Sequence, residues 1–204
     1  MNDLIITISR EFGSGGRAIG EGVAKKLGIN YYDKAIIDEA AEESGLSAEF
    51  IAKEEQTFSN SILFNLATSG GSFGVGGTSL VDKIYVSESK AIKDFSEKGP
   101  CVIVGRCADY VLREKNCFNV FVYADEDFKK KRIVEEYGFD KKEALKLIKT
   151  RDKTRSRHYN YYCDRIWGER KNYHLLVNSA AYGIEESINL IIDSAKIYQK
   201  NKEK

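Results

Sequence analysis

Histidine is scarce in this sequence of 204 residues, which contains two, and its four cysteines form no CxxC pair. Neither His158 nor His174 stands near a cysteine at the spacing of a zinc-ligand pair, so a structural zinc site is not expected. Four cysteines are also too few for a disulfide framework in a chain of this length. We therefore expect reduced thiols and a cytoplasmic location.

The sequence also lacks an excess of either charge. Its 32 basic and 31 acidic residues leave a formal net charge of +1, so the whole molecule would not attract nucleic acid or an anionic membrane. No apolar run approaches the roughly 18 residues of a membrane-spanning helix, and the N-terminal MNDLIITISR lacks the features of a signal peptide. We expect no nucleic-acid or membrane partner, and any basic site must be local. Nothing in the sequence indicates an oligomeric state.

Short apolar runs of strand length recur, separated by longer segments with helical spacing. Several runs are apolar at nearly every position, which is typical of strands covered on both faces. We therefore predict an α/β fold with a parallel sheet between layers of helices, in one domain spanning residues 1–204. The predicted strands are residues 4–8, 29–32, 101–105, 119–124 and 174–178.

About 65 residues after Asp33 contain no convincing strand, which is more than a crossover helix needs. We interpret residues 34–80 as an insertion, with helical spacing at residues 33–45, 47–56 and 81–99. Its glycine-rich part, concentrated at residues 70–77, is interpreted as a mobile loop. A second phosphate-binding loop is the alternative, although no clear strand precedes it and no clear helix follows.

Residues 4–28 run from an apolar strand through a glycine-rich turn into an amphipathic helix. Gly13, Gly15 and Gly16 surround Ser14 in the turn. Such a loop directs successive backbone N–H groups at phosphate oxygens, and the helix that begins near Gly16 adds its positive end. A tight strand-to-helix turn without a ligand is the alternative.

The phosphate-loop motif GxxxxGK[ST] is only partly present, because Arg10, Gly16 and Arg17 stand where it has glycine, lysine and a hydroxyl residue. Phosphoryl transfer moves charge onto the bridging oxygen, which needs a nearby cation. We expect Arg17 to replace the lysine by folding back over the phosphates. The alternative is an Arg17 that faces solvent or pairs with Glu21. The metal ligands stay unassigned.

A basic cluster lies at residues 149–162, KTRDKTRSRHYNYY. Arg151 and Arg155 are four residues apart and share a helix face, and Arg157 follows closely. The aromatic residues after them suggest a segment that packs down on a ligand, so we interpret residues 149–170 as a lid whose arginines bind phosphate. A solvated basic face is the alternative.

Two charged positions follow predicted strands. In CVIVGRCADYVL, Arg106 stands at the carboxyl end of a buried strand, where parallel sheets bind ligands, and Asp109 lies three residues on. Asp33 follows the strand at residues 29–32. We expect these residues to bind a substrate. Helix-starting roles for Arg106 and Asp109, and an N-cap role for Asp33, are the alternatives.

Together these segments resemble the nucleoside monophosphate kinases, most closely the cytidylate kinase-like family of P-loop proteins. The resemblance covers nearly the whole chain and is carried by ISREFGSGGRAIGEGVAKKLGINYYD, CVIVGRCADYVL and NYHLLVNSAAYGIEESINLI. It implies a five-stranded parallel sheet in the order 2-3-1-4-5, an acceptor-binding insertion after the second strand, and an arginine-bearing lid before the last.

By this resemblance, the loop residues bind the β- and γ-phosphates of ATP, and Asn178 and Ser179 border the donor base. The loop residues are Gly13, Ser14, Gly15, Gly16 and Arg17. Arg106 matches the acceptor-binding arginine of a GRD run in which Cys107 replaces the aspartate.

The lid and the acceptor region match the family less completely. Arg151 and Asp152 match the RD pair of the lid, while Arg155 stands where an acid is usual. Asp33 matches the aspartate that opens the acceptor region, but KAIIDEA replaces the TGAxYR that usually follows.

The leading hypothesis is a kinase that uses ATP and Mg²⁺ to phosphorylate a nucleoside monophosphate, with CMP as the candidate acceptor. Arg17, Arg151 and Arg155 would stabilise the transferring group. The acceptor would contact Asp33, Arg106, Asp109 and Arg157. A kinase for another small molecule is one alternative. A nucleotide-binding regulatory module without turnover is the other, since the loop lacks its lysine and hydroxyl.

Overall fold

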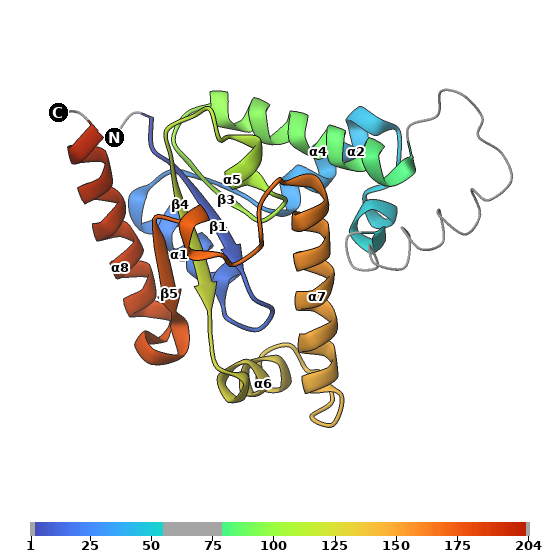
Figure 1. Cartoon of the computed structure of the whole chain (residues 1–204), viewed down its shortest axis with the longest axis vertical. Coiled ribbons are helices and arrows are strands. Elements are labelled where there is room, and N and C mark those ends of the chain that lie inside the picture. Colours follow the sequence, from blue (N-terminus) through green and yellow to red (C-terminus); the bar gives the residue numbers. More distant parts are fainter. Residues whose placement is uncertain (1–2, 55–78, 203–204) are drawn as a thin grey trace, which may run out of the picture.

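A computed structural model describes residues 3–54 and 79–202 (Figure 1). Five strands form one sheet, in which each neighbouring pair is parallel, in the order β2-β3-β1-β4-β5. The strands are β1 (Ile5–Arg10), β2 (Asn30–Tyr32), β3 (Cys101–Val104), β4 (Cys117–Tyr123) and β5 (Leu175–Asn178). The helices are α1 (Gly16–Leu27), α2 (Lys34–Ser44), α4 (Leu80–Glu97), α5 (Ala108–Val111), α6 (Glu126–Glu135), α7 (Ala144–Tyr162) and α8 (Ser179–Lys202), with a 3-10 helix η1 (Arg170–Asn172).

The predicted α/β fold and sheet order are confirmed. Every predicted strand is present, with its ends within two residues of those expected. The strands could be predicted from the sequence because burial on both faces requires apolar side chains at nearly every position of a strand. In β3, for example, every residue from Cys101 to Val104 is buried.

Helices cover both faces of the sheet. Ile6 and Ile8 of β1 pack on one face against α1 and α8, in a cluster that includes Val23 and Ile191. The neighbouring Ile5 contributes to the other face, where α4, α5 and the end of α7 pack. Because alternate residues of a strand point to opposite faces, β1 supplies both cores. None of the described helices is long and apolar enough to cross a membrane.

The predicted insertion at residues 34–80 begins with helix α2 and is followed by α4. These two helices pack against each other, and residues 48–54 form a further helical segment. The expected helices at 33–45 and 81–99 are therefore present as α2 and α4. The glycine-rich stretch at residues 70–77 lies outside the described residues.

Candidate active site

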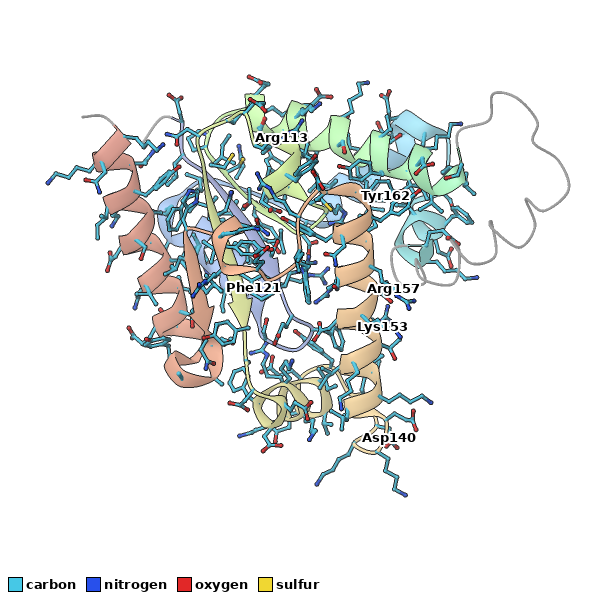
Figure 2. The ribbon with its side chains drawn as sticks, viewed as in Figure 1. Arg113, Phe121, Asp140, Lys153, Arg157 and Tyr162 are labelled. Carbon is cyan, nitrogen blue, oxygen red and sulfur yellow. The ribbon has the colours of Figure 1, made fainter. Side chains whose placement is uncertain are left out.

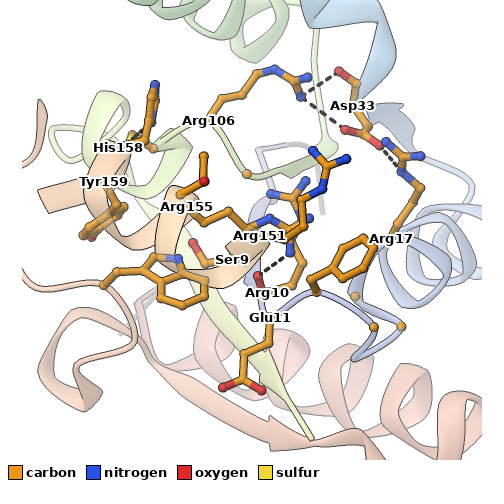
Figure 3. A pocket seen from close by; sticks show the side chains of 18 of the residues that line it. Ser9, Arg10, Glu11, Arg17, Asp33, Arg106, Arg151, Arg155, His158 and Tyr159 are labelled. Carbon is orange, nitrogen blue, oxygen red and sulfur yellow. Dashed lines mark hydrogen bonds and ion pairs between the residues drawn. The ribbon is translucent and has the colours of Figure 1, made fainter. Parts of the chain in front are cut away.

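A cavity of about 520 Å³ opens at the carboxyl ends of β1 and β3 (Figure 3). Its walls come from the β1–α1 loop, the start of α2, the turn after β3 and one face of α7. The charged side chains that line it are Arg10, Arg17, Arg106, Arg151, Arg155 and Lys34, with Asp33 and Glu11 as the carboxylates. A chain with a net charge of +1 thus concentrates cations at one cavity, an arrangement that suits a polyanion.

The loop between β1 and α1 has the geometry of an anion-binding turn. Gly15 precedes the helix in the left-handed region with φ 82°, and a Cβ there would lie 2.4 Å from Cδ1 of Ile184. Glycine is therefore required at this position both by the backbone and by packing. In the described part of the chain, the N–H groups of Gly15, Gly16 and Arg17 make no backbone hydrogen bond. Together with the positive end of α1, they can bind an anion.

Ser14 differs from its neighbours because its side chain points into the protein. It is fully buried, and its hydroxyl donates to the carbonyl of Glu11 at 2.9 Å. Its own carbonyl accepts a hydrogen bond from the hydroxyl of Ser179 at 2.6 Å. The Ser14 side chain thus stabilises the loop and does not line the cavity, so any contact of Ser14 with the phosphates stays a prediction.

Asn178 and Ser179, predicted to border the donor base, are not part of the cavity lining. Ser179 is fully buried, and its hydroxyl also donates to the carbonyl of Tyr123 at 3.2 Å. The side-chain oxygen of Asn178 accepts from the N–H of Ala180 at 3.1 Å. Neither residue lines the cavity, so any contact with the donor base stays a prediction.

Arg17 was expected to fold back over the loop, but its guanidinium is held elsewhere. Its Nε pairs with Oδ2 of Asp33, and its side chain is 67% exposed. The alternative ion pair between Arg17 and Glu21 is not observed either. The buried carboxylate of Asp33 lies between Arg17 and Arg106, as Figure 3 shows. A charge that is both exposed and paired is poorly placed to replace the missing lysine.

Arg106 is locked in place by two buried carboxylates. Its Nη1 lies 3.2 Å from Oδ1 of Asp33 and its Nε lies 3.0 Å from Oε1 of Glu88. It also donates to the Asp33 carbonyl at 3.0 Å. Arg106 and Cys107 have φ of 50° and 55°, conformations that are strained for residues with a side chain. Strain held by surrounding contacts is typical of functional turns.

The charge of Asp33 is stabilised by its arginine neighbours. Burial has the largest influence and acts to raise its pKa. Arg10, Arg106 and Arg17 together outweigh burial, so the pKa of Asp33 is lowered from its usual range. Asp33 is therefore ionised at neutral pH and fixes Arg106 and Arg17 at this end of the cavity.

Arg10 lines the cavity, although the sequence did not assign it to the site. A Cβ placed on Gly105 would lie 1.8 Å from Nη1 of Arg10, and a Cβ placed on Gly16 would lie 2.5 Å from Cβ of Arg10. Both glycines therefore leave room for this side chain. The available signal was its position as the last residue of the central strand, at the carboxyl edge where parallel sheets bind ligands.

Helix α7 presents two of its three predicted arginines to the cavity. Arg151 and Arg155 line it, whereas Arg157 is exposed and does not, so its predicted contact with the acceptor is not supported. Figure 2 shows Arg157 on the outer side of α7 near Lys153. The spacing explains this outcome, since residues four apart share a helix face and residues two apart do not.

The two cavity-facing arginines of α7 differ in their contacts. Arg155 donates from Nη1 to the carbonyl of Arg10 at 3.2 Å, and its guanidinium lies 5.5 Å from the ring centre of Phe12. Arg151 forms no hydrogen bond or ion pair with any residue that the structure describes. Burial lowers the pKa of Arg151, as expected for a cation held partly away from water.

Asp109 does not join Arg106 in the cavity. Its side chain is 2% exposed, and Oδ2 accepts a hydrogen bond of 2.6 Å from the hydroxyl of Tyr159. Its other oxygen, Oδ1, is buried without a partner in the described structure, and burial raises its pKa. Asp109 connects α5 to α7 inside the core and does not line the cavity, so its expected contact with the substrate stays a prediction.

A partly buried ion network at the loop was also not predicted. Lys129 of α6 has an exposed fraction of only 8%, and its Nζ lies 2.8 Å from Oε2 of Glu11 and 3.5 Å from Oδ2 of Asp152. Asp152 also accepts from the N–H of Phe12 at 2.6 Å. This network ties α6 and α7 to the loop. No sequence signal separated Lys129 from the two lysines that follow it.

The profile of a family described as cytidylate kinase-like matches residues 5–181. The chain belongs to the cytidylate kinase-like family. Among solved structures, an uncharacterised protein from Eubacterium ventriosum ATCC 27560 is similar to this family member, with a TM-score of 0.72. The two chains are 28% identical, over 95% of this chain and 98% of that chain. No match was found among curated proteins.

Two kinases share the fold of this cytidylate kinase-like chain at lower identity. A gluconokinase from Sinorhizobium meliloti 1021 has a TM-score of 0.59 and 13% identity, with 98% of this chain and 95% of that chain covered. A shikimate kinase from Bacteroides thetaiotaomicron has a TM-score of 0.54 and 16% identity, with 93% and 96% covered. Identities this low show the fold alone, which is that of P-loop kinases.

Proposed function

We propose that this chain is a kinase that transfers the γ-phosphoryl group of ATP to a nucleoside monophosphate, with CMP as the first acceptor to test. The observation that carries this proposal is the convergence of five arginines on one cavity at the start of α1. They come from four places far apart in sequence: β1, α1, the turn after β3 and α7. Two phosphate-bearing substrates would account for so much cationic charge.

The donor's phosphates would bind at the start of α1. The N–H groups of Gly15, Gly16 and Arg17 supply hydrogen-bond donors there, and α1 carries no acidic residue in its first turn to oppose an anion. Arg151 and Arg155 extend from α7 into the same cavity. These groups would neutralise the β- and γ-phosphates and keep them in line with the acceptor.

The acceptor would bind at the end of the cavity formed by Arg106 and Asp33. Arg106 is held in one orientation by Glu88 and Asp33. A fixed guanidinium suits a residue that must position the acceptor's phosphate. Lys34 adds a further positive charge to the cavity lining, beside Asp33. The lowered pKa of Asp33 keeps this arrangement charged at neutral pH.

Transfer itself would require little covalent chemistry from the protein. A phosphate oxygen of the acceptor attacks the γ-phosphorus, the bond from that phosphorus to the bridging oxygen breaks, and ADP leaves with the electron pair. Arg151 and Arg155 would stabilise the charge that moves onto the bridging oxygen. Tyr159 and Trp167, which also line the cavity, would help to exclude water.

A coupled assay of ADP release tests this proposal. Purified protein would be given ATP and Mg²⁺ with each of CMP, UMP, AMP and GMP, and with shikimate and gluconate as acceptors without a nucleotide. We expect release above the no-acceptor rate with one or more monophosphates. Release only with a sugar acid or another metabolite would contradict the nucleotide acceptor and favour a small-molecule kinase.

A regulatory module that binds nucleotide without turnover is the second candidate. It is favoured by the loop, where Gly16 and Arg17 stand in place of lysine and a hydroxyl residue. ATP binding by calorimetry, together with no ADP release for any acceptor tested, would support it and exclude the kinase.

A further inference from the structure

P-loop NTPases hold Mg²⁺ with a hydroxyl group of the loop and an aspartate at the end of a neighbouring strand. In this chain Arg17 stands at the hydroxyl position, and the Ser14 hydroxyl donates to the Glu11 carbonyl. Strand β3 ends at the fully buried Val104, and Gly105 follows it. Strand β4, the other neighbour of β1, ends at Tyr123, and the nearby Asp125 caps α6 by accepting from the N–H of Phe128 and does not line the cavity. Neither of the two usual ligands is therefore available among these residues.

The two carboxylates of the cavity are also engaged. Asp33 is bound by Arg17 and Arg106, and its lowered pKa reflects these cations. Glu11 is bound by Lys129 and accepts from the N–H of Ala124 at 3.3 Å. Across residues 3–54 and 79–202, no group of three or more His, Cys, Asp or Glu side chains could hold a metal ion. The residues present do not fit a resident Mg²⁺.

The cavity is instead lined by arginines. Arg151 enters the cavity with no hydrogen-bond or ion-pair partner among the described residues, and Arg10 and Arg155 line the same wall. Like charges in a partly dry cavity repel one another until an anion enters. Arginine is also suited to phosphate because its planar fork donates two parallel hydrogen bonds.

We propose that the site neutralises nucleotide phosphates with arginine side chains, Arg151 above all, and that no residue within 3–54 or 79–202 supplies a ligand to a divalent cation. This inference rests on the proposed function, because it concerns the same donor site. It follows that metal-free nucleotide binds at least as tightly as its Mg²⁺ complex. Mg²⁺ on the phosphates removes negative charge that the arginines would otherwise contact, so it weakens their attraction.

Calorimetry of ADP binding to the full chain tests the inference, at one ionic strength, with EDTA or with excess Mg²⁺. We expect the Kd in EDTA to equal the Kd in Mg²⁺ or to be up to about tenfold lower, the scale of one charge-assisted hydrogen bond. A Kd that is reproducibly higher in EDTA than in Mg²⁺ would show that the metal contributes to the site and would overturn the inference.

Two variants on one helix sharpen the test. Arg151→Ala should raise the Kd about tenfold or more in both conditions, and Arg151→Lys should recover part of the loss. Arg157→Ala removes the same charge from the exposed face of α7 and should leave the Kd unchanged. Equal effects of Arg151→Ala and Arg157→Ala would mean that net charge, and not this site, attracts the nucleotide, which would overturn the inference.

The failures of the two proposals are distinguishable. ADP release with a monophosphate, combined with binding that requires Mg²⁺, would overturn the inference and leave the kinase intact. Metal-independent binding without ADP release would support the inference and overturn the kinase. No ADP binding in either condition would overturn both.

Discussion

The arginines of the cavity differ in how firmly their neighbours hold them. Arg106 is fixed by two buried carboxylates, so its guanidinium is preorganised but largely neutralised. Arg17 shares Asp33 with it and is mostly exposed. Arg151 has no hydrogen-bond or ion-pair partner within the described residues. An approaching phosphate therefore gains more from Arg151, which no carboxylate already satisfies, than from Arg106 or Arg17.

This difference predicts an order of effects on turnover. Arg151→Ala should lower kcat about 10²- to 10³-fold, as the loss of one preorganised charge-stabilising donor does. Arg17→Ala should lower it much less, because its charge is exposed and paired with Asp33. The measurement is kcat for ADP release with the best acceptor, and Arg157→Ala is the matched control. A larger decrease in kcat for Arg17→Ala than for Arg151→Ala would contradict this order and would indicate that Arg17 replaces the missing lysine.

At the level of elements, helix α7 divides into two parts. Its first part, residues 144–156, carries Arg151 and Arg155 toward the cavity, and its second part, from residue 157 on, is anchored where Tyr159 and Cys163 are buried in the core. The interpretation of residues 149–170 as a lid thus applies best to the first part. The second part already belongs to the core beneath the sheet.

Hydrogen exchange should detect this division. With ADP and CMP bound, amide exchange should slow in residues 144–156, because phosphates draw the arginines together. Residues 157–163 should change little, since they are anchored in the absence of ligand. Binding confirmed by calorimetry with no change in residues 144–156 would contradict a ligand-ordered first part.

The contact between α5 and α7 makes stability depend on pH through Asp109. Burial raises the folded-state pKa of Asp109, while the hydrogen bond from Tyr159 opposes the rise. A carboxyl whose pKa is higher in the folded protein contributes full stability below its unfolded pKa of about 3.9, and loses it as pH rises through the folded pKa. The free energy of unfolding should therefore fall over that interval because of this group.

Asp109→Asn removes the titration and keeps an oxygen that can accept from Tyr159. Urea unfolding of both proteins at several pH values would give the free energy of unfolding of each. The quantity to follow is the value for the protein with Asp109 minus the value for Asp109→Asn. We expect this difference to fall as pH rises above about 4 and then to level off. A difference that rises over the same interval would mean that the pKa of Asp109 is lowered in the folded state.

At the level of the whole molecule, an almost neutral chain carries a local cation cluster. The lining holds five arginines and a lysine against two carboxylates, while the net charge of the chain is +1. The compensating acidic residues must lie elsewhere. The unliganded protein thus contains repulsion at one place that a bound anion relieves.

Inorganic phosphate should therefore raise the thermal midpoint Tm at constant ionic strength, whereas an equivalent amount of chloride should not. By ligand linkage, phosphate at 100 times its Kd would add about 2.7 kcal/mol of stability. Arg151→Ala should reduce the rise, and Lys153→Ala, at an exposed position of the same helix, should leave it unchanged. An identical Tm in phosphate and chloride would contradict an anion site.

Local pattern was enough to predict the strands, the helix after the glycine turn and the shared face of Arg151 and Arg155. These features depend on residues that are adjacent or a few positions apart in the sequence. Burial of one face of a helix, or of both faces of a strand, produces a repeating pattern of apolar residues that the sequence shows. The resemblance to a known family added the sheet order, which local pattern does not contain. The glycine loop at residues 11–15 could also be predicted without its lysine, because the glycines, the strand before them and the helix after them are local features.

Only the tertiary structure decided where the charged side chains point. Asp33 and Arg106 are 73 positions apart, yet they form an ion pair because β2 and β3 end side by side. Asp109 turns into the core toward Tyr159, and Arg10 lies over Gly105. Such directions are set by partners distant in sequence, whose positions follow from the packing of the whole sheet. A local pattern cannot encode them, because it records a side chain's neighbours along the chain and not those across it.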